Sequence, residues 1–213
     1  MELLDLHGAW VSLDAMGCQK EIAKQIVEQG GHYVVTVKGN QEHLEEDIES
    51  CFRKVYEEGT EGIHYESYET EDTGHGRHEL RSYEIITEPQ GIRNHQAWTQ
   101  LCVIGKCNTE RTVHGKTSCE VRYFIGSKRC SVRQYGKVLR HHWGIENNLH
   151  WQMDVTFGED ASRIKNRHGG ENFAMLRRLA LGLLKQHPSQ ASIRSKRYEA
   201  DLDTEFLEEV LRG

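Results

Sequence analysis

Residues 9 to 37 read AWVSLDAMGCQKEIAKQIVEQGGHYVVTV and contain a strand, a helix and a second strand. The run from Ala9 to Leu13 is apolar and β-prone, and it ends on the carboxylate Asp14. From Gln19 to Gln29 apolar residues recur at helical spacing, and a glycine pair then ends the helix. His32 to Val37 is a second apolar strand. A strand, helix, strand unit of this length predicts two neighbouring parallel strands joined by a right-handed crossover, and therefore an α/β fold.

The remainder of the chain changes character twice. Residues from Leu44 to Glu58 carry apolar side chains at helical spacing, which predicts a further helix. Between Ile63 and Ser127, alternating and β-branched stretches are separated by glycine-containing turns, which is typical of a largely antiparallel β-rich region. From Val132 onward the pattern is helical again, and Glu171 to Lys185 forms a last strong helix. The expected strands of the middle region are Tyr65 to Glu71, His78 to Ile86, Ala97 to Ile104 and Ser118 to Ile125.

Bulk composition indicates a soluble protein with a core of ordinary size. The 213 residues are 37% hydrophobic and 28% charged, with a mean hydropathy of -0.71. No run approaches the roughly 18 apolar residues of a membrane span, and the first residues lack the features of a signal peptide. We therefore expect no membrane partner and a cytoplasmic location. Six cysteines without a C-x-x-C pair exclude a zinc ribbon and a thioredoxin-type motif.

Charge is unevenly distributed along the chain. The formal net charge is -6, yet residues 121–200 contain 15 Lys and Arg against 6 Asp and Glu, a local excess of +9. The rest of the chain therefore carries -15. A basic C-terminal half beside an acidic N-terminal half is compatible with one face that binds nucleic acid. Solvated lysines and arginines on helix surfaces would produce the same count, so charge alone leaves both interpretations open.

Two carboxylates occupy positions that suit metal-dependent phosphoryl transfer. This chemistry needs several acids converging on divalent metal ions about 3.5–4 Å apart. Asp14 ends an early strand, and the ligands of open α/β sheets gather at the carboxyl ends of the strands. Glu146 lies on the otherwise apolar face of the helix after Val132, where a charged residue needs a reason. Each also has a plain structural interpretation: Asp14 as a cap or turn residue, and Glu146 as a half-buried acid paired with a histidine or arginine.

Several long motifs resemble transposases of the H-repeat-associated group of bacterial insertion sequences. In chain order these are VSLDAMGCQK at 11–20, YVVTVKGNQ at 33–41, GHGR at 74–77, HWGIENNLHW at 142–151, DVTFGED at 154–160 and the last helix at 172–185. The resemblance covers nearly the whole chain. Related transposases often place a Tyr and an Arg before the Glu and a Lys after it, whereas this chain has Leu139, His142 and Met153 at that spacing.

The resemblance implies an RNase H-like catalytic core that cuts and joins DNA at the ends of a mobile element. Its Asp, Asp, Glu triad would hold two Mg²⁺ (or Mn²⁺) ions, with Asp14 as the second Asp and Glu146 as the Glu. The first Asp would lie on an earlier strand, so we expect an N-terminally truncated copy that lacks one catalytic acid. An inactive remnant that only binds DNA or self-associates is the alternative, and the activity of this chain is left open. A metal nuclease of another class would need a third acid, for which Asp154 is the candidate.

The predicted fold class is α/β, a partial RNase H-like core interrupted by a β-rich insertion and followed by C-terminal helices. Residues 1–58 would form the first part of that core, and residues 59–130 the insertion. Residues 131–187 would carry the catalytic helix, and residues 188–213 would be a C-terminal tail.

The resemblance makes double-stranded DNA, at element ends and at the target, the expected partner, and it leaves a homodimer open. The side chains expected to contact DNA are Lys38, Asn40, Gln41, Arg77, His142, His150, Arg163, Lys165 and Arg167. The alternative for the first three is a polar turn, and the alternative for the two histidines is filling the core. We do not expect the histidines to bind the metal, because Mg²⁺ prefers oxygen ligands. Trp143 and Trp151 either stack on an unpaired base or belong to the core.

Overall fold

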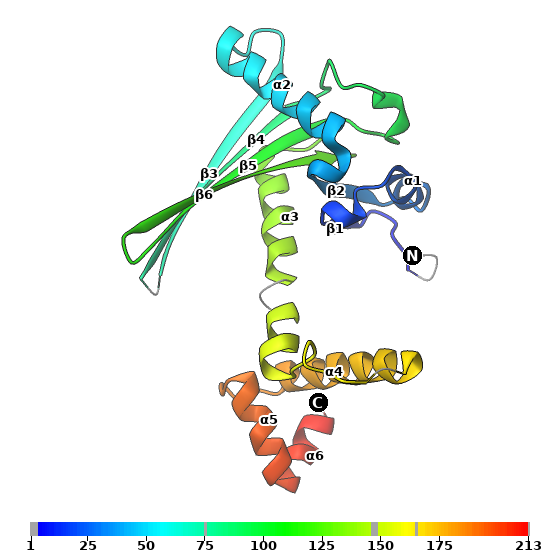
Figure 1. The fold of residues 1–213 in the computed structure, drawn as a ribbon, viewed down its shortest axis with the longest axis vertical. Coiled ribbons are helices and arrows are strands. Elements are labelled where there is room, and N and C mark those ends of the chain that lie inside the picture. The colour runs from blue at the N-terminus through cyan, green and yellow to red at the C-terminus, as the bar shows by residue number, and fades with distance from the viewer. Residues whose placement is uncertain (1–3, 75, 146–148, 165, 213) are drawn as a thin grey trace. The chain divides into compact units, whose positions relative to one another are not determined.

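The computed structural model describes residues 4–74, 76–145, 149–164 and 166–212, which divide into two compact units, 1–142 and 143–213. Unit 1 contains one six-stranded sheet in the order β1-β2-β6-β5-β4-β3, with β1 parallel to β2 and every other pair antiparallel (Figure 1). The strands are β1 (Trp10–Leu13), β2 (His32–Val37), β3 (His64–Gly74), β4 (Arg77–Thr87), β5 (Val103–Val113) and β6 (Lys116–Gly126). The predicted α/β class is confirmed.

The first three elements form the predicted parallel unit. Helix α1 (Lys20–Glu28) connects β1 to β2, and Leu13 pairs with Val35 in parallel register. The helix ends where expected because Gly30 adopts a φ of 76° that favours glycine. Every residue of β2 after His32 is buried, as expected for a strand covered on both faces.

The predicted β-rich stretch consists of two long antiparallel hairpins. The β5–β6 turn places His114 and Gly115 at positive φ, the geometry of a two-residue turn that matches strand twist. The strand expected from Ala97 to Ile104 is wrong. Asn94 and Gln100 adopt left-handed conformations that interrupt the extended chain, and β5 runs instead from Val103 to Val113. Its polar half stays extended because β4 and β6 pair with it on both sides.

Helices cover both faces of this sheet in unit 1 (Figure 1). Helix α2 (Glu42–Glu58) buries Ile48 and Phe52 in one cluster with Ile86 and Ile104 of the sheet. Helix α3 (Val132–Ile145) packs on the opposite face, where the rings of Tyr135 and Phe124 stack 5.5 Å apart. The two faces follow from strand alternation, because successive side chains point to opposite sides.

Unit 2 is helical. A π-helical turn (Gln152–Thr156) is followed by α4 (Arg167–Gln186), α5 (Ile193–Leu202) and α6 (Thr204–Arg212). The expected last strong helix is therefore confirmed as α4, and its Leu184 packs with Phe206 and Val210 of α6. No helix within the described ranges combines the length and apolar character needed to cross a bilayer.

A buried lysine closes the C-terminal end of α4. Lys196 is 4% exposed, and its Nζ donates to the carbonyl oxygens of Leu184 at 3.0 Å and His187 at 2.8 Å. These carbonyls belong to the last turn of α4 and to its C-cap residue, where acceptors lack partners within the helix. We expect Lys196→Met to lower the free energy of unfolding of unit 2 by about 1–3 kcal/mol, the cost of leaving buried acceptors unsatisfied. Urea unfolding followed by circular dichroism measures this loss.

The control is Lys137→Met, the same substitution at an exposed lysine of α3. Surface substitutions of this kind change stability by about 0.5 kcal/mol or less. Equal stabilities of the two variants would contradict a capping role for Lys196.

Candidate active site

Asp14 lies at the carboxyl end of β1, as the sequence predicts. It caps the 3-10 turn η1 (Ala15–Gly17), and its Oδ1 accepts a hydrogen bond from the backbone N–H of Gly17 at 3.2 Å. The side chain is exposed, and Oδ2 has no hydrogen-bond partner among the residues that the structure describes. The turn interpretation is therefore confirmed. It does not compete with a metal-binding role, because one carboxylate oxygen still faces solvent.

A second turn lies beside η1. The turn η2 (Gly39–Gln41) follows β2, and because β1 and β2 are parallel neighbours both turns lie at the same sheet edge. Asn40 Nδ2 donates to the carbonyl oxygen of Ala15 at 2.6 Å, and Gln41 Nε2 donates to that of Cys18 at 2.9 Å. Of the three predicted DNA contacts here, the amides of Asn40 and Gln41 thus hold the Asp14 turn. Lys38 is exposed.

Helix α3, which is distant in the sequence, also contacts β1. His142 Nδ1 lies 3.1 Å from Ser12 Oγ, within hydrogen-bond distance. Ser12 precedes Asp14 by two residues on β1, so the contact ties α3 to the strand that carries the acid. Sequence reasoning missed Ser12, whose only signal was a hydroxyl in an otherwise apolar strand. Glu146, the second predicted catalytic residue, lies outside the described residues.

The described donors fit part of a metal site. Asp14 offers an exposed carboxylate oxygen, the ligand type that Mg²⁺ and Mn²⁺ prefer. Within the described ranges, no group of three or more His, Cys, Asp or Glu side chains could hold a metal ion. Cys18 follows the turn but is buried, and burial raises the pKa of its thiol to about 12. It is therefore a neutral thiol at pH 7.

The other predicted residues are spread over both units. In unit 1, Arg77 is half-exposed and pairs with the buried Glu79 at 3.4 Å. In unit 2, His150, Asp154 and Arg163 are exposed. Lys165 lies outside the described residues, as does the side chain of Arg167.

The two tryptophans near these residues differ in exposure. Trp151 is 53% exposed, so it is not a core residue of unit 2. Trp143 is half-buried.

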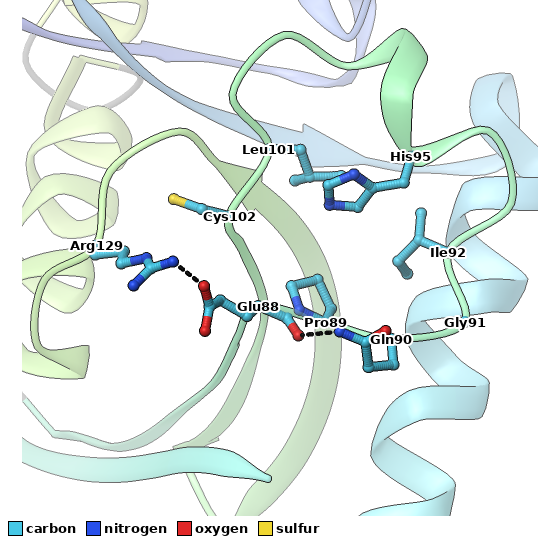
Figure 2. A pocket seen from close by; sticks show the side chains of 9 residues that line it. All are labelled: Glu88, Pro89, Gln90, Gly91, Ile92, His95, Leu101, Cys102 and Arg129. Carbon is cyan, nitrogen blue, oxygen red and sulfur yellow. Dashed lines mark hydrogen bonds and ion pairs between the residues drawn. The ribbon is translucent and has the colours of Figure 1, made fainter.

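A shallow pocket of about 360 Å³ lies elsewhere in unit 1, in the connection between β4 and β5 (Figure 2). Arg129 and Glu88 form an ion pair across its wall, and His95 and Cys102 contribute to its lining. None of the predicted site residues lines it. The candidate site is therefore the exposed edge at the ends of β1 and β2.

The chain is similar to proteins of one known family. The family model described as "Transposase DDE domain" matches residues 1–183. "Putative protein YbfL" and "H repeat-associated putative transposase YhhI", both of Escherichia coli K12, are each 32% identical over 219 residues, covering 100% of this chain and 57% of the relative. "Putative transposase YncI" of Escherichia coli O157:H7 is 32% identical over 216 residues, covering 99% of this chain and 55% of the relative. The chain thus spans a little over half the length of these curated relatives.

Proposed function

Because the chain belongs to the transposase DDE domain family, we propose that it carries out metal-dependent cleavage of phosphodiester bonds and strand transfer at the ends of an insertion sequence. The family assignment agrees with the resemblance drawn from the motifs. The observation that carries the proposal is the exposed Asp14 carboxylate at the carboxyl end of a parallel strand, with His142 of α3 within hydrogen-bond distance of Ser12 on that strand. The sheet order and the C-terminal helices are consistent with an RNase H-like core. The proposal concerns the activity of a full-length transposase that contains this chain, and it places that activity in the cytoplasm.

Asp14 and Glu146 are the residues that we assign to the metal. DDE transposases in general use divalent metal ions. Two Mg²⁺ or Mn²⁺ ions would supply polarisation of the attacking hydroxyl and neutralisation of the charge on the leaving oxygen. Glu146 follows His142 by four residues in the sequence, and His142 contacts the strand that leads to Asp14. This chain distance supports Glu146 as the partner acid.

Double-stranded DNA is the proposed partner, held through its phosphates. The basic excess of +9 over residues 121–200 favours contacts that do not depend on base sequence. The proposed phosphate contacts are Lys38, Arg77, His142, His150, Arg163, Lys165 and Arg167. The half-exposed Trp151 is the candidate for stacking on an unpaired base near a cut end.

A DNA cleavage assay tests the proposal. Labelled duplexes that carry element ends are incubated with the chain alone, and with a version preceded by the N-terminal region of a full-length relative. We expect the longer version to cleave in Mg²⁺ and to be inactive after chelation, and the chain alone to show little or no cleavage. Robust strand transfer by the 213-residue chain alone would overturn the expectation that one acid is missing. DNA binding without cleavage by either version would support the alternative of an inactive DNA-binding module.

A further inference from the structure

The turn that Asp14 caps is held from outside by two amide side chains. Asn40 Nδ2 donates to the Ala15 carbonyl at 2.6 Å, and Gln41 Nε2 donates to the Cys18 carbonyl at 2.9 Å. These two acceptors lie at the beginning and just past the end of η1. The turn is therefore attached at both ends to the segment that follows β2.

The Ala15 carbonyl also accepts from Cys18 N–H at 3.1 Å, and the remaining carbonyls of the turn are satisfied locally. The Asp14 carbonyl accepts from Gly17 N–H at 3.1 Å, and the Gly17 carbonyl accepts from Gln19 N–H at 2.9 Å. The Met16 carbonyl accepts from Gln19 Nε2 at 3.1 Å. Every backbone acceptor from Asp14 to Cys18 thus has a partner in an exposed turn, where water would otherwise serve. Such complete pairing fixes the direction of the peptide planes.

The geometry of the sheet makes this attachment specific. Parallel pairing of Leu13 with Val35 places the chain after β2 beside the chain after β1. The buried Cys18 anchors the far end of the turn in the core. The Asp14 carboxylate is oriented by its hydrogen bond to Gly17 N–H, so any movement of the turn moves the carboxylate.

We propose that Asn40 and Gln41 are positioning residues for the reaction, which act by holding the Asp14 turn rather than by binding DNA phosphate. The inference rests on the proposed function, because only the proposed function makes Asp14 a catalytic residue. It assigns to these two side chains a role different from the DNA contact expected from the motif. Each amide nitrogen commits one of its two N–H donors to a carbonyl of the turn, which leaves at most one donor for a phosphate.

The backbone amide of Gly17 reports on the turn directly. Its N–H donates to both the carbonyl and the side chain of Asp14, so its hydrogen exchange rate measures opening of the turn. The test compares the wild-type chain with Asn40→Ala, Gln41→Ala and the control Gln96→Ala, by NMR without metal or DNA. Gln96 is an exposed amide residue in another 3-10 turn, His95–Ala97. We expect Asn40→Ala and Gln41→Ala each to raise the Gly17 exchange rate about two- to tenfold, the effect of one hydrogen bond, and Gln96→Ala to leave it unchanged.

Titration with Mn²⁺ on the same samples links the turn to the metal. A paramagnetic ion at Asp14 should broaden the Gly17 signal of the wild type, and Asp14→Asn should abolish this broadening. Asn40→Ala should need about two- to tenfold more Mn²⁺ for the same broadening. Wild-type exchange rates in both amide variants would overturn the attachment itself, and unchanged Mn²⁺ dependence in Asn40→Ala would overturn its positioning role. If Mn²⁺ leaves the wild-type Gly17 signal unbroadened, or broadens it equally in Asp14→Asn, the result would count against the proposed function. The exchange rates would still test whether Asn40 and Gln41 hold the turn.

Discussion

Replacing Asp14 with asparagine should reduce DNA cleavage by the N-terminally extended protein at least about a hundredfold. A metal ion that stabilises the transition state contributes several kcal/mol, and each 1.4 kcal/mol changes the rate about tenfold. Asparagine keeps the shape of the side chain and is itself a good capping residue, so the hydrogen bond to Gly17 N–H is retained. The variant therefore removes the charge needed for metal binding while it preserves the turn.

A matched control lies nearby on the same chain. Asp5 is another exposed aspartate, whose Oδ1 accepts a hydrogen bond from the backbone N–H of His7 at 3.0 Å. Asp5→Asn should cleave at the wild-type rate under the same Mg²⁺ concentration. Glu146→Gln should lose activity to the same extent as Asp14→Asn. Wild-type cleavage by Asp14→Asn would remove Asp14 from the site and with it the central assignment.

The sequence predicted best those parts of the fold that local signals determine. The strand, helix, strand unit of residues 9–37 was confirmed because its apolar periodicity, glycine stop and strand lengths all favour the same structure. The strand expected from Ala97 to Ile104 was wrong because β5 is extended through pairing with β4 and β6, and its polar half has no apolar pattern of its own. Pairing between distant segments outweighs local propensity in such hairpins.

For the candidate site too, the sequence predicted what depends on local signals and not what depends on contacts between distant segments. A carboxylate directly after a short apolar run predicted the place of Asp14 at the carboxyl end of β1, although β1 is half-buried and not fully buried. The hydrogen bonds from Asn40 and Gln41 to the Asp14 turn depend on tertiary contact between two strand ends, so residue type alone left a DNA contact and a polar turn both open. The contact of His142 with Ser12 joins positions 130 residues apart, and no local pattern predicts it. The meeting of Glu146 with Asp14 stays a prediction.

The largest expected loss of stability comes from the packing of Phe124 over Gly105. These residues are direct cross-strand partners on β6 and β5, and Phe124 is 1% exposed. A Cβ on Gly105 would lie 2.0 Å from Cζ of the Phe124 ring, far inside van der Waals contact. Gly105→Ala should therefore cost about 1–3 kcal/mol through overpacking. Phe124→Ala should cost about 3–5 kcal/mol, because it leaves a cavity against Tyr135.

Combining the two substitutions tests whether the clash with the Phe124 ring causes the loss of stability in Gly105→Ala. In Gly105→Ala/Phe124→Ala the new methyl group meets no ring, so the double variant should be no less stable than Phe124→Ala alone. The coupling energy would then be about 1–3 kcal/mol, measured as the departure from additivity in denaturant unfolding. Gly74→Ala is the control, because a Cβ on this β3 glycine meets nothing within 4 Å and should change stability by less than about 1 kcal/mol. Additive losses in the double variant would mean that Gly105 is required for backbone conformation and not for the approach of the Phe124 ring.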